Sequence, residues 1–118
     1  MSKQNRRIEY YFLDILDAIE DINNFVGELR YEDFSNDKKT IYAVIRCLEI
    51  IGEAVKHIPQ ELKQKYSTIP WREIAGMRDK LIHAYFGIDV SLVWHTAKKD
   101  IPFLQKEISA IKIKEFDS

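Results

Sequence analysis

The chain of 118 residues is long enough for one hydrophobic core, and we expect a single domain over residues 1–118. Hydrophobic residues make up 46% of the sequence and charged residues 31%, a composition typical of a folded protein rather than a disordered one. The net charge of −1 excludes a protein that coats nucleic acid through a generally basic surface, so any contact with RNA must be local.

Three features of the sequence bear on where the protein acts. No uncharged run approaches the roughly 20 residues that a helix needs to cross a bilayer, so we expect no contact with a membrane. The first seven residues are basic, but the apolar core of a signal peptide does not follow them. The single cysteine, Cys47, excludes an internal disulfide and is typical of a reducing compartment. The sequence therefore predicts a cytoplasmic protein.

The first half of the chain shows the spacing of two amphipathic helices. Residues 6–30 are predicted to form the first, because apolar residues recur there at intervals of three and four. A polar segment, 31–37, then supplies candidate N-caps for a second helix over residues 37–58, which ends before Pro59. The candidate caps are Ser35, Asn36 and Asp37, and the apolar stripe of the first helix is Ile8, Phe12, Ile15, Ile19, Ile22, Val26 and Leu29.

The second predicted helix is apolar on two sides, and only a narrow stripe of it is polar. A helix that is apolar on two sides must bury both of them. In so small a bundle, we expect the second face to pack against another subunit. The first face comprises Ile41, Val44, Ile45, Leu48, Ile51 and Val55, the second Ala43, Cys47, Ile50 and Ala54, and the polar stripe Arg46, Glu49, Glu53 and His57.

A short helix and a longer one are predicted next. Residues 59–65 are expected to form the short helix, with Pro59 in its first turn. Pro70 is expected to start the longer helix, which should end near Gly87, because glycine commonly follows the last residue of a helix.

The last predicted helix begins after a capping residue, either Asp89 or Ser91. Pro102 lies inside its apolar pattern and should bend or break it. No segment shows a convincing alternation typical of a strand. Four main helices with short connections predict an all-α, up-and-down four-helix bundle with one short additional helix.

Residues 78–85 read Arg-Asp-Lys-Leu-Ile-His-Ala-Tyr and carry the most chemical information. On a regular helix, Arg78 would lie in the middle of an apolar arc that includes Trp71 and Leu81. A guanidinium on a packing face is unusual, because a buried charge is costly without a partner. His83 would lie on the opposite face beside Arg72 and Lys80, and its imidazole can carry a proton near neutral pH.

The helical spacing also bears on the number of subunits. Arg78 and His83 would diverge by about 140° and lie about 7.5 Å apart along a helix axis, so they could not easily grip one phosphate together. A two-fold axis would bring two copies of each residue to one place. This geometry and the two apolar faces of the second helix both favour a homodimer with a shared cleft.

The segment 78–85 resembles the R-x4-H-x-Y motif of HepT-like toxins, which are ribonucleases of the HEPN family. Four further segments are similar to that family, so that the resemblance covers most of the chain. They are Ile69-Pro70-Trp71-Arg72-Glu73-Ile74-Ala75-Gly76-Met77, Leu48-Glu49-Ile50-Ile51-Gly52-Glu53-Ala54, Phe86-Gly87 and Val93-Trp94. The resemblance implies a HEPN-like bundle that cleaves RNA without a metal or other cofactor.

The resemblance implies that Arg78 and His83 are the catalytic pair. When a 2′-hydroxyl attacks the adjacent phosphate, one group must accept its proton and another must protonate the leaving 5′-oxygen. A histidine can perform either transfer, and the planar fork of an arginine stabilises charged phosphoryl oxygens. Lys80 and Arg72 could hold flanking phosphates, and Arg46 could assist them.

Tyr85 stands at the tyrosine of the motif. HepT-like toxins are encoded beside a minimal nucleotidyltransferase, an MntA-like antitoxin that can AMPylate this tyrosine. The resemblance therefore implies a toxin–antitoxin pair (type VII) in which added nucleotide phosphate repels RNA from the cleft. The alternative is a catalytically silent HEPN bundle that only serves as the binding partner of a nucleotidyltransferase.

Structural interpretations stand beside these functional ones. Arg78 could simply pair with Glu49 or Glu53 on the second helix, because charges that face a packing surface are usually paired. Glu49, Glu53 and His57 share one face and invite a metal site, but matching ligands on facing helices are lacking, and we predict a polar border of the cleft instead. The aromatic residues Tyr10, Tyr11, Phe12, Trp71 and Trp94 are expected to serve packing rather than the stacking of bases.

Overall fold

The computed structural model describes residues 2–83 and 87–117, except for the side chain of His83. Helices make up most of this part of the chain, as the sequence predicts, and a single short hairpin accompanies them there. In chain order the helices are α1 (Lys3–Val26), α2 (Tyr31–Ser35), α3 (Lys38–Lys56), α4 (Gln60–Lys65), α5 (Trp71–Ala75), α6 (Met77–Leu81), α7 (Val90–His95), the π-helical turn η1 (Thr96–Asp100) and α8 (Ile101–Phe116).

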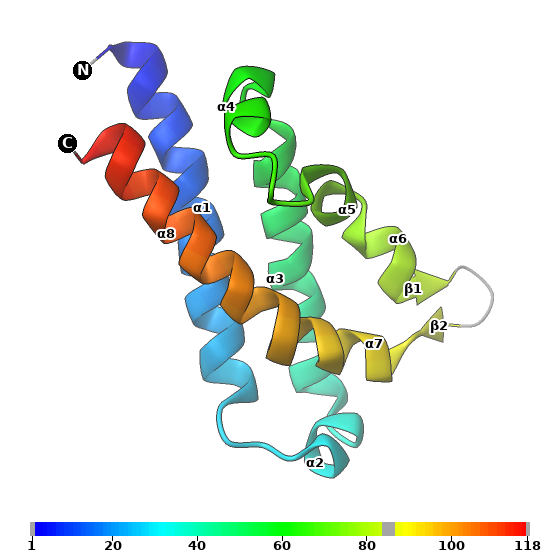
Figure 1. Ribbon diagram of the computed structural model, residues 1–118. Helices are drawn as coiled ribbons and strands as arrows, with labels where there is room; N and C mark the ends of the chain where they lie inside the picture. Colours follow the sequence, from blue (N-terminus) through cyan, green and yellow to red (C-terminus); the bar gives the residue numbers. More distant parts are fainter. Residues whose placement is uncertain (1, 84–86, 118) are drawn as a thin grey trace.

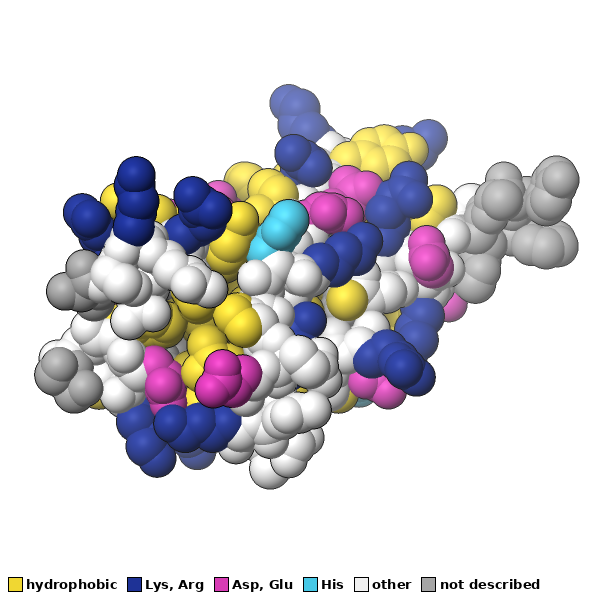
Figure 2. All heavy atoms as spheres, turned by 90° about the horizontal axis from the view of Figure 1, so that it is seen from above, with side chains coloured by type: hydrophobic (Ala, Val, Ile, Leu, Met, Phe, Trp, Pro, Cys, Tyr) yellow, Lys and Arg dark blue, Asp and Glu magenta, His cyan; other side chains and the backbone are white. Residues whose placement is uncertain are grey.

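The helices form an up-and-down bundle (Figure 1). α1 and α3 run side by side in opposite directions, α5 and α6 return along α3, and α7, η1 and α8 lead back across the bundle to α1. The prediction of an all-α bundle is confirmed. Within the described residues, none of the helices is both long and apolar enough to cross a membrane. Figure 2 views the end of the bundle where α1 begins, and Lys and Arg side chains gather around it.

The apolar stripe of α1 supplies one side of the core, as its spacing predicts. Five of its residues are at most 3% exposed, whereas Ile8 near the start of the helix is only partly buried, as is Leu29, which lies beyond the end of α1 at Val26. The facing stripe of α8 contributes Leu104, Ile108 and Ile111. The buried residues of the α1 stripe are Phe12, Ile15, Ile19, Ile22 and Val26.

Much of the apolar surface of α3 is covered within the same chain. α1 packs on one side of this helix, and α5, α6 and α7 pack against it as well. Cys47 and Ala54, on the second face, are each only 5% exposed. Ala43 and Ile50 on the same face are only partly buried, so the expectation that another subunit packs there stays a prediction. Burial raises the pKa of the Cys47 thiol, and the negative charge of Asp21 on α1 raises it further.

The predicted helix starts and stops are largely confirmed. Asp37 caps α3 by accepting a hydrogen bond from the Thr40 N–H, and Asp89 caps α7 in the same way. Pro59 precedes the first residue of α4, and Pro70 precedes α5. The segment before α3 differs from the prediction, because part of it folds into the short helix α2 rather than remaining polar loop.

Pro102 does not break the last helix. The π-helical turn η1 lies directly before α8, so the chain passes from α7 to α8 without leaving helical conformation. A proline lacks the N–H that would bond to the carbonyl four residues earlier. A π-helical turn widens the helix at such a point and places the proline in the first turn of α8, where no donor is needed.

The helix predicted over residues 70–87 is shorter than expected and divided in two. Gly76 separates α5 from α6, and α6 ends at Leu81. Ile82 is extended, with φ −120° and ψ 116°, and begins the strand β1 (Ile82–His83), which pairs antiparallel with β2 (Gly87–Ile88). Gly87 has a φ of +80°, a conformation that other residues rarely adopt. The glycine expected to end a helix instead belongs to a hairpin.

α3 and α5 approach each other closely at Gly52. A Cβ atom at this position would lie 3.3 Å from the carbonyl oxygens of both Ile74 and Ala75. A glycine lets two backbones meet where any side chain would press against them. Gly52 is buried in α3, and its lack of a side chain therefore decides how near α5 lies.

We predict that Gly52→Val lowers the free energy of unfolding by about 1–3 kcal/mol, because its methyl groups would press on the α5 backbone. Urea unfolding followed by circular dichroism measures this. Gly76→Val is the matched control, since a Cβ there meets only the Arg72 carbonyl oxygen at an ordinary 3.6 Å. Equal losses in the two variants would contradict the proposed importance of the α3–α5 approach.

Candidate functional site

Two anchors position the segment that carries Arg78. The buried indole of Trp71 donates hydrogen bonds to the carbonyl oxygens of Lys63 at 3.1 Å and Tyr66 at 3.0 Å. These bonds tie the first residue of α5 to the end of α4. Gly52 then lets α5 lie against α3. The next helix, α6, is thereby directed along α3, with Arg78 in its first turn.

Arg78 is exposed rather than buried on a packing face. Its side chain is 58% exposed, because Gly76 interrupts the helix and changes its phase before Arg78 is reached. The expected ion pair is present: the Arg78 Nε lies 2.5 Å from the Glu49 Oε2. Since the pair engages Nε alone, the two terminal nitrogens of the guanidinium have no ion-pair partner in the described part of the chain and can donate to an anion.

Arg78 lines a polar hollow of about 370 Å³ between α3 and the α5–α6 segment. Three cationic and three acidic side chains border it. Lys56 is paired with Glu53 at 3.1 Å, while Arg46 has no ion-pair partner among the described residues. The hollow thus holds one unpaired arginine and a second with free terminal nitrogens. Its charged residues are Arg46, Glu49, Glu53, Lys56, Arg78 and Asp79.

His83 stands on β1, where its backbone pairs with Gly87. The helical separation of 140° from Arg78 is therefore wrong, because the helix ends two residues earlier. The backbones of the two residues still lie near each other, because the N–H of Ile82, the residue before His83, donates a hydrogen bond to the Arg78 carbonyl oxygen. Tyr85, the predicted modification site, lies outside the described residues.

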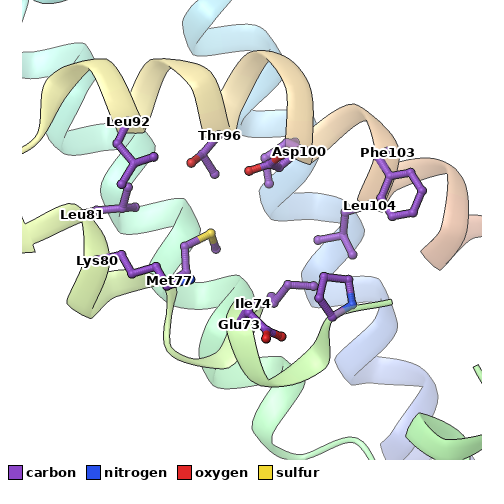
Figure 3. Close-up of a pocket in the computed structure, with 12 residues that line it drawn as sticks. Glu73, Ile74, Met77, Lys80, Leu81, Leu92, Thr96, Asp100, Phe103 and Leu104 are labelled. Atoms are coloured by element: carbon purple, nitrogen blue, oxygen red, sulfur yellow. The ribbon is translucent and has the colours of Figure 1, made fainter. Parts of the chain in front are cut away.

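The other predicted phosphate contacts do not share one face. Arg72 lines a separate hollow near α4, whereas Lys80 borders an apolar groove of about 260 Å³ between α6 and the α7–α8 segment (Figure 3). Only Arg46, of the three secondary candidates, is brought to the hollow of Arg78. The prediction that Arg72 and Lys80 lie on the His83 face required a continuous helix, which Gly76 and Ile82 interrupt.

The polar stripe of α3 has separate partners along its length. Glu49 pairs with Arg78, Glu53 pairs with Lys56, and the His57 ring stacks on Tyr11 at 4.8 Å between centroids. No group of three potential ligands close enough to hold a metal ion occurs in the described range. Glu49 and Glu53 border the hollow of Arg78, and the expectation that the stripe borders an RNA cleft stays a prediction. Lys56, which the sequence does not single out, also borders the hollow, and its place three residues after Glu53 puts it beside the stripe.

The aromatic residues divide between the core and the surface. Phe12 and Trp71 are buried, and Trp94 packs against Phe34 with ring centroids 5.1 Å apart, as expected for packing residues. Tyr11 is partly buried against His57. Tyr10 is 62% exposed, so the packing role expected for it is not seen within the protomer.

Comparison with known proteins agrees with the resemblance in the motif. A sequence model of the Ribonuclease HepT-like family matches residues 15–111. The chain belongs to the HepT-like ribonuclease family. "Probable ribonuclease HepT" of Thermococcus cleftensis is 56% identical over 102 residues, which cover 86% of this chain and 93% of that protein.

Two further members of the family are also similar over most of their length. A "Putative RNase" of Methanocaldococcus jannaschii is 55% identical over 106 residues, covering 90% of this chain and 91% of the relative. A "Putative RNase" of Caldanaerobacter subterraneus is 48% identical over 105 residues, covering 89% and 94%. No solved structure matches the chain significantly.

We predict that the Arg78–Glu49 pair contributes little to the stability of this HepT-like protein. Arg78 is largely exposed, and exposed ion pairs contribute about 0–1 kcal/mol. A double-mutant cycle of Arg78→Ala, Glu49→Ala and the double variant, measured by urea unfolding, should give a coupling energy below about 1 kcal/mol. A coupling of several kcal/mol would instead make Arg78 a structural residue whose loss unfolds the bundle.

Proposed function

We propose that this protein is a metal-independent endoribonuclease toxin that cleaves RNA with Arg78 and His83. The observation that carries the proposal is the exposed guanidinium of Arg78, held by its Nε at the edge of a polar hollow, directly before the strand of His83. Membership of the HepT-like ribonuclease family supports it. A "Probable ribonuclease HepT" among the relatives is consistent with RNA as the substrate.

Each residue has a defined chemical task in this scheme. Arg78 donates its terminal N–H groups to the phosphate whose bond is broken and stabilises the added negative charge of the transition state. Arg46, which lies in the same hollow without an ion-pair partner among the described residues, holds a neighbouring phosphate. His83 accepts the proton of the attacking 2′-hydroxyl or protonates the leaving 5′-oxygen. Because one imidazole performs one of these transfers at a time, a second histidine would complete the reaction.

A homodimer would supply that second histidine. In a two-fold arrangement, the hairpins of two protomers meet and each contributes Arg78 and His83 to a common cleft. The apolar groove beside α6, with Phe103 47% exposed at its border, lies next to the segment that would have to meet its copy (Figure 3).

The antitoxin would act on Tyr85, two residues after His83 in the sequence. We propose that a cognate minimal nucleotidyltransferase transfers AMP from ATP to its hydroxyl oxygen, breaking the α–β phosphoanhydride bond and releasing pyrophosphate. An added nucleotide carries negative charge and bulk to a site that must accept RNA phosphate, and both would oppose binding of the substrate. The alternative, a silent bundle that only binds the nucleotidyltransferase, predicts no cleavage of RNA at all.

The first functional prediction concerns catalysis. The parent protein should cleave single-stranded RNA in the presence of EDTA, and His83→Ala or Arg78→Ala should each lower the rate by about 10²–10⁴-fold, the range of one general acid–base group or one charge-stabilising donor. Cleavage of a fluorescently labelled RNA measures this. Circular dichroism must show that each variant is folded. Full activity in a folded His83→Ala protein would rule out the mechanism, and an inactive parent would favour the silent bundle.

Mixing the two inactive variants tests the shared cleft. A mixed dimer of Arg78→Ala and His83→Ala protomers keeps one arginine and one histidine in the common site. That histidine can perform one of the two proton transfers beside an arginine, so mixing should restore part, but not all, of the activity. Neither variant alone can do so. Sedimentation should show twice the chain mass for the parent. A monomer that cleaves RNA at full rate would contradict the dimer but leave the roles of Arg78 and His83 intact.

The second functional prediction concerns Tyr85. Co-expression with a cognate nucleotidyltransferase should add the mass of AMP to the parent protein and abolish its activity. Tyr85→Phe should still cleave RNA, because the hydroxyl has no task in the proton transfers, but should escape the adduct. Intact-mass spectrometry distinguishes the outcomes. An adduct that persists on Tyr85→Phe would place the target elsewhere, and a silenced parent without any adduct would show inhibition by binding alone.

A further inference from the structure

A second group of cations lies away from Arg78, at the start of α1. Lys3, Arg6 and Arg7, which we call the amino-terminal basic patch, are all exposed on the first two turns of this helix. With Tyr10 they border one shallow depression of about 290 Å³. Lys3 and Arg7 also border a larger one of about 440 Å³, which continues onto His57 and Pro59 at the end of α3.

The amino-terminal basic patch is not compensated by acidic side chains. In the part of the chain that the structure describes, none of its three cations forms an ion pair, and the first turn of α1 contains no acid. Glu9, the first acidic residue of the helix, is directed to Lys112 on α8 at 3.7 Å. Positive charge is unfavourable at the N-terminal end of a helix, because the helix dipole is positive there. The patch therefore opposes folding stability slightly, as residues that serve a ligand often do.

Aromatic rings stand beside these cations. Tyr10 is 62% exposed next to Arg6 and Arg7, and Tyr11 forms a parallel stack with His57, with ring planes only 11° apart. Cations that bind phosphates combined with exposed rings that stack on bases are the means by which proteins hold single-stranded nucleic acid. A patch for a simple anion would not need the exposed ring of Tyr10.

The end of α3 lies between the patch and the hollow of Arg78. His57 and Pro59 border the depression at the patch, while Lys56, the residue before His57, borders the hollow that contains Arg46 and Arg78. Arg46 and His57 are eleven residues apart and lie on the same polar stripe, which corresponds to about 16 Å along the helix axis. A stacked strand rises about 3.4 Å per nucleotide, so about five nucleotides cover this distance.

We infer that the amino-terminal basic patch, together with Tyr10, binds the single-stranded RNA substrate several nucleotides away from the bond that is cleaved. This inference rests on the proposed function, because it makes the patch an extension of the same RNA path. Lys3, Arg6 and Arg7 contact phosphates, and the ring of Tyr10 stacks on a base. Substrates long enough to reach from Arg78 to the patch are then bound more tightly than short ones.

The test measures binding separately from cleavage. A labelled 20-nucleotide RNA with 2′-O-methyl groups cannot be cleaved by attack of its own 2′-oxygen, so fluorescence anisotropy reports binding by the intact protein. The variant Lys3→Gln/Arg6→Gln/Arg7→Gln should bind this RNA at least tenfold more weakly than the parent. Three lost phosphate contacts should also reduce the slope of log K against log salt by about 2, at about 0.7 per contact for single strands.

A matched variant controls for net charge. Lys38→Gln/Lys39→Gln/Lys99→Gln removes three exposed cations away from the start of α1, at the beginning of α3 and in η1, and should bind as the parent does. Tyr10→Ala tests the stacking of a base: it should weaken RNA binding at least about fivefold but leave binding of long-chain polyphosphate, which has no bases, unchanged.

Cleavage then separates this inference from the proposed function. The patch variant should cleave a dinucleotide at the parental rate but show a raised KM for the 20-nucleotide RNA with unmodified 2′-hydroxyls. Equal binding of the modified RNA by the patch variant and the parent would overturn the inference, even if both cleave RNA normally. Equal losses in the patch variant and the matched variant would also overturn it, by showing a general charge effect. Weakened binding to polyglutamate alone would make the patch a site for an acidic protein instead.

Discussion

The close contact between α3 and α5 at Gly52 determines where the chemical groups of this protein lie. Because Gly52 has no side chain, the carbonyl oxygens of Ile74 and Ala75 come within reach of the α3 backbone. The indole of Trp71 is hydrogen-bonded to the end of α4 and thereby fixes the position of the first residue of α5. α6 then leaves this contact so that Arg78 meets Glu49, one turn before Gly52 on α3. The polar hollow is thus a product of backbone packing, and the Arg78–Glu49 ion pair inside it contributes little free energy by comparison.

Much of the fold could be predicted from the sequence, because the long helices have regular apolar stripes and recognisable caps such as Asp37 and Asp89. The segment from Pro70 to Gly87 could not. A single helical period does not hold across Gly76, which changes the phase, or across the β-branched Ile82, which is extended. The hairpin that results depends on pairing between residues on either side of 84–86, and a helical periodicity does not detect such pairing.

The candidate site, like the fold, could be predicted from the sequence only in part. The motif residues could be found from their types and spacing, and the rule that an inward-facing charge needs a partner offers Glu49 or Glu53 for Arg78. Glu49 is the partner in the structure, although Arg78 is exposed. Arg72 and Lys80 lie in separate hollows, because the continuous helix that would bring them to one face is interrupted at Gly76 and ends at Leu81. Net charge could not reveal the patch at the start of α1, since only the folded structure shows which cations are left without acids.

The buried position of Cys47 has a practical consequence. This residue is the single cysteine of the chain and lies on α3, where burial and the nearby Asp21 keep its thiol protonated at neutral pH. A protonated, inaccessible thiol does not react with alkylating or disulfide reagents. It becomes reactive when α3 separates from its neighbours, so the labelling rate measures how often the bundle opens. The native thiol of Cys47 can therefore report on transient opening of the bundle, and no cysteine needs to be engineered for this purpose.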